Sequence, residues 1–170
     1  ARRSGKERSV RKRRDPVFRG LTVSLVLLVV AAVLSGTAFG LSWTVSIPVY
    51  AHWNSMWLFL VTVVSCVMYA QALSVRRRYF AETGFRVVRE GDAKVSTSSD
   101  HDITVGMIFE FCSVFGYLQL IVQARQAELV VIATLAVAAG LFVLAALIVS
   151  LWTSGVFGWL ARMTVPRRAE

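Results

Sequence analysis

Four long apolar segments divide the chain, and each is bounded by polar or charged residues. They are Leu21–Leu41, Ser55–Val75, Ile103–Gln123 and Leu129–Trp152. A helix needs about 20 predominantly apolar residues to cross a hydrocarbon layer about 30 Å thick. Each segment reaches or approaches that length, so the pattern predicts an all-α, polytopic membrane protein with four transmembrane helices.

The composition agrees with this pattern. Hydrophobic types make up 56% of the 170 residues and charged types 17%, whereas a soluble domain averages about 45–50% apolar and about 25% charged residues. The composition therefore excludes a disordered chain and argues against a soluble globule.

The basic residues predict the topology. Of the 19 Lys and Arg residues, nine lie in the first 19 positions, six in residues 76–102 and three after residue 152, which leaves only Arg125 on the other side. Because Lys and Arg accumulate in cytoplasmic loops, both termini are expected on the cytoplasmic-type side. The domain organisation follows as a basic tail (1–19), a transmembrane domain (20–152) with an inner loop (76–102), and an interfacial C-terminal tail (153–170).

The inner loop, residues 76–102, is too short to bury a core of its own. Within it, Phe85–Val88 and Lys94–Ser96 flank Glu90-Gly91-Asp92, a pattern that predicts a turn between two short strands.

Two more local expectations concern the ends of the spans. Asp100 and Asp102 directly precede the third span, where they would cap its helix and complement the helix dipole. The uncharged, aromatic connection Ser42–Asn54 is expected to lie flat in the membrane interface.

Glu110 is the most informative single residue, because it lies about seven residues, or roughly 10 Å, into the third span. A charge at that depth costs about 2–3 kcal/mol even on insertion scales, so such residues face a bundle interior or a cavity. Ser113 and Tyr117 share its helix face, and Tyr69 on the second span lies at a similar depth. We favour a structural role over a proton- or cation-binding role.

Small residues recur at helix-packing spacing in two spans. Ala32, Gly36 and Gly40 form one such series in the first span, and Ala136 and Gly140 form another in the fourth. Such spacings allow close contact between helices, either within one chain or with another protein.

The basic run Arg11, Lys12, Arg13 and Arg14, together with Arg76, Arg77 and Arg78, is assigned to anionic lipids or protein partners. Nucleic acid is disfavoured because no aromatic residues are interleaved with the basic run. The Arg-rich start also fits the remnant of an organellar presequence, although Glu7 and Asp15 are atypical of one.

Catalytic chemistry is not apparent. The chain has no phosphate loop, nucleophile elbow or HExxH motif, and its two cysteines form no CxxC motif. We therefore expect no enzyme activity, no cofactor, no metal site and no soluble small-molecule substrate.

These features favour a structural or accessory subunit of a larger integral-membrane complex of respiratory, photosynthetic or secretory type. Its partners would be other integral-membrane subunits and anionic lipids. The alternative is a small oligomeric proton- or cation-coupled transporter or channel that uses Glu110. The charge pattern fits a bacterial inner membrane and an organellar inner membrane equally well.

Overall fold

The computed structural model describes residues 16–45, 49–83 and 93–154. These described residues form four helices: α2 (Pro16–Ser42), α3 (Val49–Thr83), α4 (Ala93–Gln126) and α5 (Val130–Thr153). All four are long and apolar enough to cross a membrane. The all-helical prediction is therefore confirmed, and the fold is compatible with an integral membrane protein.

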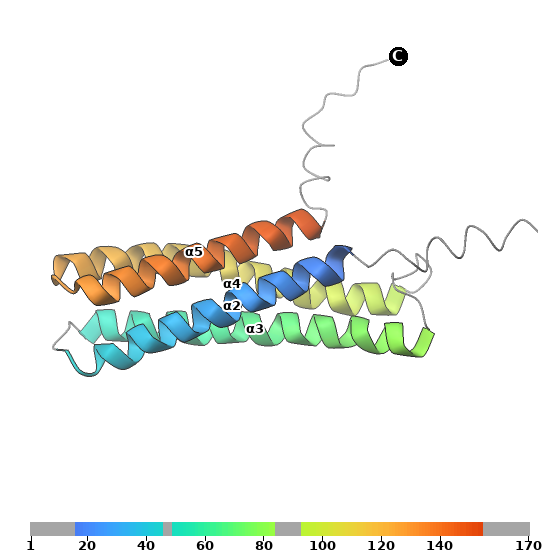
Figure 1. The fold of residues 1–170 in the computed structure, drawn as a ribbon, viewed down its shortest axis with the longest axis horizontal. Coiled ribbons are helices and arrows are strands. Elements are labelled where there is room, and N and C mark those ends of the chain that lie inside the picture. Colours follow the sequence, from blue (N-terminus) through green and yellow to red (C-terminus); the bar gives the residue numbers. More distant parts are fainter. Residues whose placement is uncertain (1–15, 46–48, 84–92, 155–170) are drawn as a thin grey trace, which may run out of the picture.

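The helices form one bundle and run alternately in opposite directions (Figure 1). Around the bundle, α2 packs against α3 and α5, and α4 packs against the same two helices. The α2–α3 and α4–α5 connections lie at one end, called here the hairpin end. The start of α2 and the end of α5 lie at the opposite end, called here the terminal end.

Helices α3 and α4 are longer than the spans expected from hydropathy. The strand prediction for Lys94–Ser96 is wrong, because these residues belong to α4. Phe85–Val88 and the Glu90–Asp92 turn lie outside the described residues. The physical reason is that extending an existing helix adds hydrogen bonds without a new nucleus, whereas an isolated two-stranded hairpin is marginal in water.

Two further local predictions are also wrong. Asp100 and Asp102 lie inside α4, seven or more residues after its start at Ala93, so they do not cap it. The second half of the Ser42–Asn54 connection is helical, because α3 already begins at Val49. There, His52 Nδ1 lies 2.7 Å from Ser42 Oγ, a hydrogen bond that ties the start of α3 to the end of α2.

Buried positions recur at alternating steps of three and four residues. On α3 they are Ala51, Ser55, Leu58, Thr62, Ser65, Tyr69, Ala72, Arg76 and Tyr79. On α4 they are Ser99, Ile103, Gly106, Glu110, Ser113, Tyr117, Leu120 and Ala124. A 3.5-residue repeat of this kind is typical of left-handed helix bundles with coiled-coil-like packing.

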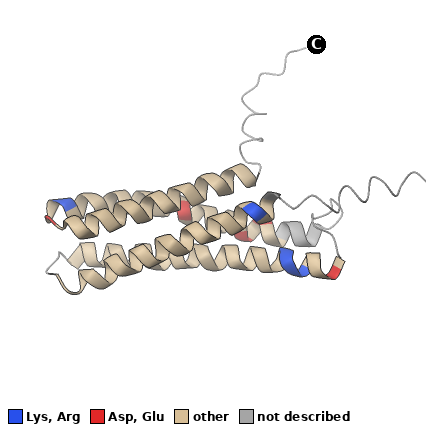
Figure 2. Ribbon diagram, in the orientation of Figure 1, with Lys and Arg blue, Asp and Glu red and all other residues tan. Residues whose placement is uncertain are grey.

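The interior of the bundle is rich in small and hydroxyl-bearing residues, and large apolar side chains cover its outside. Ala31, Ala139 and Ala146 are completely buried, whereas Val33 is 64% exposed and Trp152 75%. Most charged residues of the described helices lie towards the two ends of the bundle, and one acidic position lies midway along it (Figure 2). This distribution suits helices that pack in lipid, where small residues permit close approach and apolar side chains face outward.

Candidate functional site: polar layers inside the bundle

Glu110 lies at the centre of the bundle with no exposed surface. The Tyr69 hydroxyl of α3 donates a hydrogen bond to Glu110 Oε2 over 3.0 Å. The other oxygen, Oε1, has no hydrogen-bond partner among the described residues. One carboxyl oxygen is therefore held by a hydrogen bond from a neighbouring helix. The other is buried without a described hydrogen bond, which costs free energy for a polar atom.

The polar contact continues from Tyr69 to the remaining two helices. Ser150 on α5 is a polar neighbour of the Tyr69 hydroxyl. Ser150 Oγ donates to Ser24 Oγ of α2 over 2.9 Å, and Ser24 Oγ donates to the carbonyl oxygen of Ala146 over 3.1 Å. Glu110, Tyr69, Ser150 and Ser24, called here the Glu110 layer, thus connect all four helices.

A second polar layer lies nearer the hairpin end. Tyr117 Oη of α4 is 3.0 Å from Thr62 Oγ1 of α3, and Ser35 of α2 is a polar neighbour whose own hydroxyl donates to the Ala31 carbonyl oxygen. Thr62 donates in addition to the carbonyl oxygen of Leu58 over 2.7 Å. Tyr117, Thr62 and Ser35, called here the Tyr117 layer, hold neutral groups only.

Ser113 lies between the two layers and joins neither through a hydrogen bond described here. Its hydroxyl donates to the carbonyl oxygen of Phe109, one turn earlier on the same helix, over 2.7 Å. It is buried on the same face as Glu110 and Tyr117. Its role is therefore that of a small residue at the helix contact.

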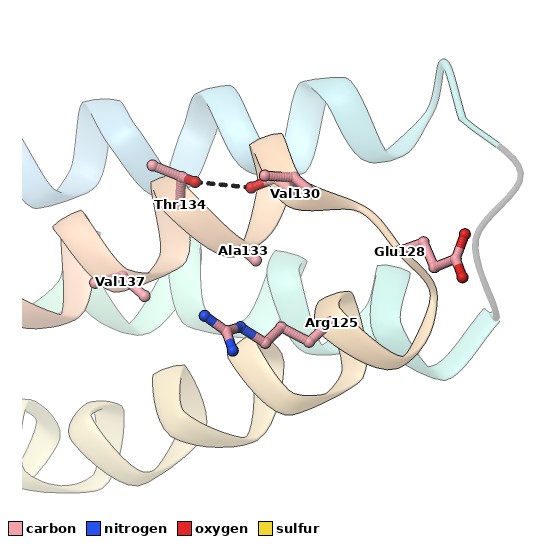
Figure 3. A pocket seen from close by; sticks show the side chains of 6 residues that line it. All are labelled: Arg125, Glu128, Val130, Ala133, Thr134 and Val137. Atoms are coloured by element: carbon pink, nitrogen blue, oxygen red, sulfur yellow. Dashed lines mark hydrogen bonds between the residues drawn. The ribbon is translucent and has the colours of Figure 1, made fainter.

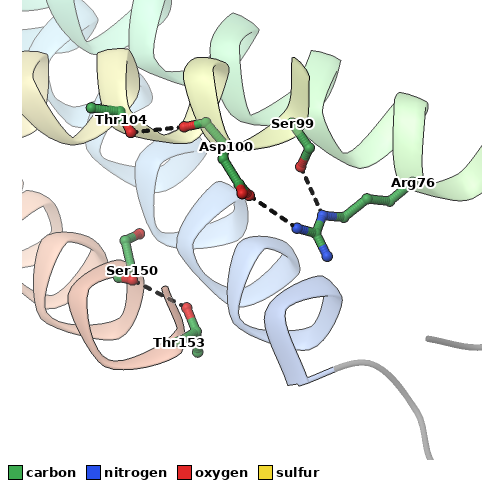
Figure 4. Close-up of polar contacts among 6 residues, drawn as sticks. All are labelled: Arg76, Ser99, Asp100, Thr104, Ser150 and Thr153. Carbon is green, nitrogen blue, oxygen red and sulfur yellow. Dashed lines mark hydrogen bonds and ion pairs between the residues drawn. The ribbon is translucent and has the colours of Figure 1, made fainter. Parts of the chain in front are cut away.

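Arg76 lies in a third polar layer, towards the terminal end (Figure 4). Its side chain is buried, and Nε donates to Ser99 Oγ over 2.7 Å. Nη2 forms an ion pair with Asp100 Oδ1 over 3.3 Å. These contacts fasten α3 to α4 in the region predicted to be a loop, so Asp100 serves as an ion-pair partner.

The other predicted lipid- or partner-binding residues fall into two groups. Arg77 and Arg78 are exposed on α3, beside the buried Arg76. Arg11, Lys12, Arg13 and Arg14 lie outside the described residues. Binding of lipid or partners by these groups stays a prediction.

The small-residue series divide between the inside and the outside of the bundle. Ala136 is buried, and a methyl group added at Gly140 would lie 3.1 Å from Tyr117 Cβ. In contrast, Ala32 and Gly36 line an open groove of about 500 Å³ between α2 and α3, and Phe59 also lines it. Gly40 is exposed, and nothing lies within 4 Å of the position of an added methyl group.

Within the described ranges, no group of three or more His, Cys, Asp or Glu side chains could hold a metal ion. Cys66 and Cys112 are both free thiols.

In comparisons with known proteins, no family model, no curated protein and no solved structure matches the chain. The function of the chain is therefore inferred from the geometry of this bundle.

Sequence reasoning missed four hydroxyl-bearing members of the layers: Ser24 as part of a chain to α5, and Ser35, Thr62 and Ser150 altogether. A signal for them was present. Five small or hydroxyl residues and one leucine recur at steps of three and four along the first span and its end: Ser24, Leu28, Ala31, Ser35, Ala38 and Ser42, all of which are buried. Within an apolar segment, a heptad of small residues indicates the packed face.

Proposed function

We propose that this chain is a non-catalytic, structural or accessory subunit of a larger integral-membrane complex, inserted with both termini on the cytoplasmic-type side of a bacterial or organellar inner membrane. The observation that carries the proposal is the groove between α2 and α3. Its lining includes Ala32 and Gly36, two half-buried residues of a type that permits close helix approach, with Phe59 of α3 beside Gly36. A transmembrane helix of a partner subunit fits such a surface.

The packing of the interior supports a structural role. Glu110 has no exposed surface, and it lines none of the three cavities described, which lie between pairs of neighbouring helices. The Glu110 layer draws polar groups from all four helices, which favours one fixed arrangement of the bundle. The surfaces left for function are then the outer helix faces and the two ends.

The test is purification from native membranes in mild detergent, followed by mass spectrometry of the proteins that accompany the chain in stoichiometric amounts. We expect a hetero-complex that is lost when Ala32→Leu and Gly40→Leu enlarge two small residues of the α2 small-residue series, whereas Gly36 is left unchanged because an added side chain there would meet Phe59 of the same chain. The matched control is Val26→Leu, because Val26 is 59% exposed on the same helix and does not line the groove. A monomer, or an oligomer of this chain alone, would overturn the proposal.

A second candidate function is a small oligomeric transporter or channel for protons or cations, and the unpartnered Oε1 of Glu110 favours it. A carboxyl oxygen without a protein partner is available to a proton or a cation once the bundle opens. Four helices enclose little room, so several copies would be needed to form a path. Proton-linked flux into liposomes that disappears in Glu110→Gln would support this function, and unchanged flux would exclude it.

A further inference from the structure

Among the described residues, Glu110 Oε1 is the one buried side-chain polar atom without a hydrogen-bond partner. The residue has no exposed surface, and the three described grooves are lined by other residues. An ionised carboxylate can only accept hydrogen bonds, whereas the protonated form also has one O–H group to donate. The protonation state of Glu110 therefore depends on which of its neighbours can donate a hydrogen bond.

The hydroxyl protons of the Glu110 layer are already committed to other acceptors. A hydroxyl group has a single proton to donate. Tyr69 donates its proton to Oε2 over 3.0 Å and so has none left for Oε1. Ser150 donates to Ser24 over 2.9 Å, and Ser24 donates to the carbonyl oxygen of Ala146 over 3.1 Å. Because this chain of donors ends at a backbone carbonyl, which can only accept, neither serine has a proton left for Glu110.

The remaining hydroxyl and thiol groups near this level are also unable to donate to Oε1. Ser65 of α3 and Ser113 of α4 donate to backbone carbonyl oxygens four residues earlier on their own helices, over 3.2 and 2.7 Å. Cys66 of α3 is a neighbour of Glu110 with a free thiol, but this thiol does not reach Oε1. The described residues therefore supply no hydrogen-bond donor for this oxygen.

The described basic side chains do not compensate the carboxyl group either. Arg76 lies seven residues from Tyr69, about 10 Å along α3, and its guanidinium forms an ion pair with Asp100. Arg125 lies 15 residues beyond Glu110, about 22 Å along α4, where it lines the groove at the hairpin end (Figure 3). The other described basic side chains are exposed: Arg19, Arg77 and Arg78. An ionised Glu110 would be a buried charge without a counter-charge from these groups, which costs far more than a buried neutral group.

We propose that Glu110 is a proton-binding site. Its side chain is a neutral carboxylic acid in the resting bundle, with the proton on Oε1 and with Oε2 as the carbonyl oxygen that accepts from Tyr69. A metal cation fits less well, because a hard cation takes about six oxygen ligands and the described residues offer no cluster of acidic side chains. Loss of the proton would leave a bare buried charge, so release requires water or a cation to reach Oε1. The proposal applies to an accessory subunit and to a transporter alike, and for a transporter it names the proton as the ion carried.

The experiment is infrared spectroscopy of the purified full chain in vesicles of an ether-linked phosphatidylcholine, which has no carbonyl group of its own. At about pH 6.5, carboxyl groups with ordinary pKa values are ionised. We expect the carbonyl stretching band of one protonated carboxyl group, which moves to lower frequency when the glutamates carry carbon-13 and is lost in Glu110→Gln. Tyr69→Phe removes the hydrogen bond to Oε2 and should raise the frequency of this band. Tyr117→Phe removes a hydroxyl from the neutral layer and is the matched control that should leave the band unchanged.

Two results would overturn the proposal. If the unmodified chain has no such isotope-sensitive band, and Glu110→Gln removes carboxylate bands instead, Glu110 is ionised in the bundle. If those carboxylate bands shift when choline replaces sodium and potassium in the buffer, the ligand is a metal cation. The isotope shift of the unmodified chain decides the protonation state without any substitution, so a variant that fails to fold does not prevent a decision. The accessory-subunit function is tested separately by co-purification, and neither infrared result bears on it.

Discussion

Two polar layers, seven residues apart along α4, each place one tyrosine ring in the centre of the bundle. Tyr69 packs against Gly106 and Tyr117 packs against Gly140, and in both cases a methyl group added to the glycine would lie 3.1 Å from the tyrosine. The layers differ in what the tyrosine hydroxyl meets. Tyr117 meets the neutral hydroxyl of Thr62, whereas Tyr69 meets the carboxyl group of Glu110.

This difference distinguishes the groups that helix packing requires from the carboxyl group that it does not require. Because the Tyr117 layer connects α3 and α4 with neutral groups alone, the bundle does not need a carboxyl group to hold two helices together. Glu110 therefore adds something that packing does not require, at a depth where polar atoms are expensive. The following variants test how far the two layers are equivalent.

Removal of either tyrosine ring should have the largest effect. We expect Tyr69→Ala and Tyr117→Ala each to lower the free energy of unfolding by about 3–5 kcal/mol, since both rings are fully buried and their loss leaves a cavity. The free energy is measured by SDS titration in mixed micelles, with helicity followed by circular dichroism. Leu118→Ala, at a side chain that is 55% exposed, is the control. A loss below about 1 kcal/mol at either tyrosine would contradict the packing described for that layer.

The two glycines should respond less strongly and unequally. At Gly140 an added methyl group meets Tyr117 Cβ, which cannot move without the backbone of α4, whereas at Gly106 it meets the edge of the Tyr69 ring, which can tilt. We expect Gly140→Ala to cost about 1–3 kcal/mol in the same titration, and Gly106→Ala to cost less.

Gly40→Ala is the matched control for both glycine variants. Its added methyl group has nothing within 4 Å, so this variant should gain up to about 1 kcal/mol from helix propensity. A larger loss at Gly106 than at Gly140 would show that the Tyr69 ring is held more rigidly than the Tyr117 backbone.

Removal of the hydroxyl groups alone sharpens the comparison. Tyr69→Phe leaves Glu110 without its one described hydrogen-bond partner, and a buried polar group left unsatisfied costs about 1–3 kcal/mol. Tyr117→Phe should cost only about 0.6 kcal/mol, the average for hydrogen bonds between membrane helices, because Thr62 keeps its bond to Leu58. Equal losses in the unfolding titration would mean that the Glu110 carboxyl group has another partner.

The fold was largely accessible from the sequence, because apolar length alone predicts helices that can span a membrane. The apolar segment ends where the charged residues begin, so hydropathy did not predict that α3 continues as a helix past Arg76. It depends on contacts between helices: the buried guanidinium of Arg76 meets Ser99 and Asp100, which lie 23 and 24 residues further along the chain. No local pattern reports such a pairing.

Of the Glu110 layer, the sequence predicted the pair Glu110 and Tyr69 but not the contact between Ser150 and Ser24. The cost of burying Glu110 indicated an interior position, and antiparallel spans indicated Tyr69 as a neighbour at the same depth. The chain from Ser150 to Ser24 joins residues 126 positions apart, and it depends on α5 packing beside α2. That closure of the bundle does not follow from hydropathy.

A similarly small effect is expected from Glu110→Gln. The amide oxygen of the variant can accept the Tyr69 hydrogen bond at the position of Oε2, and its NH₂ group takes the place of Oε1, which has no described partner in the native chain. The unfolding free energy should therefore change by less than about 1 kcal/mol, because the number of satisfied polar atoms stays the same.

Glu110→Ala is the companion variant, since it removes the group altogether and frees the Tyr69 hydroxyl. It should cost more than Glu110→Gln in the same SDS titration, because Tyr69 then loses its acceptor inside the bundle. If Glu110→Gln instead costs as much as Glu110→Ala, the carboxyl chemistry itself is needed and Oε1 has a partner that an amide cannot bind, such as a cation. The Glu110 layer would then differ from the Tyr117 layer in function as well as in composition, which is what the transporter alternative requires.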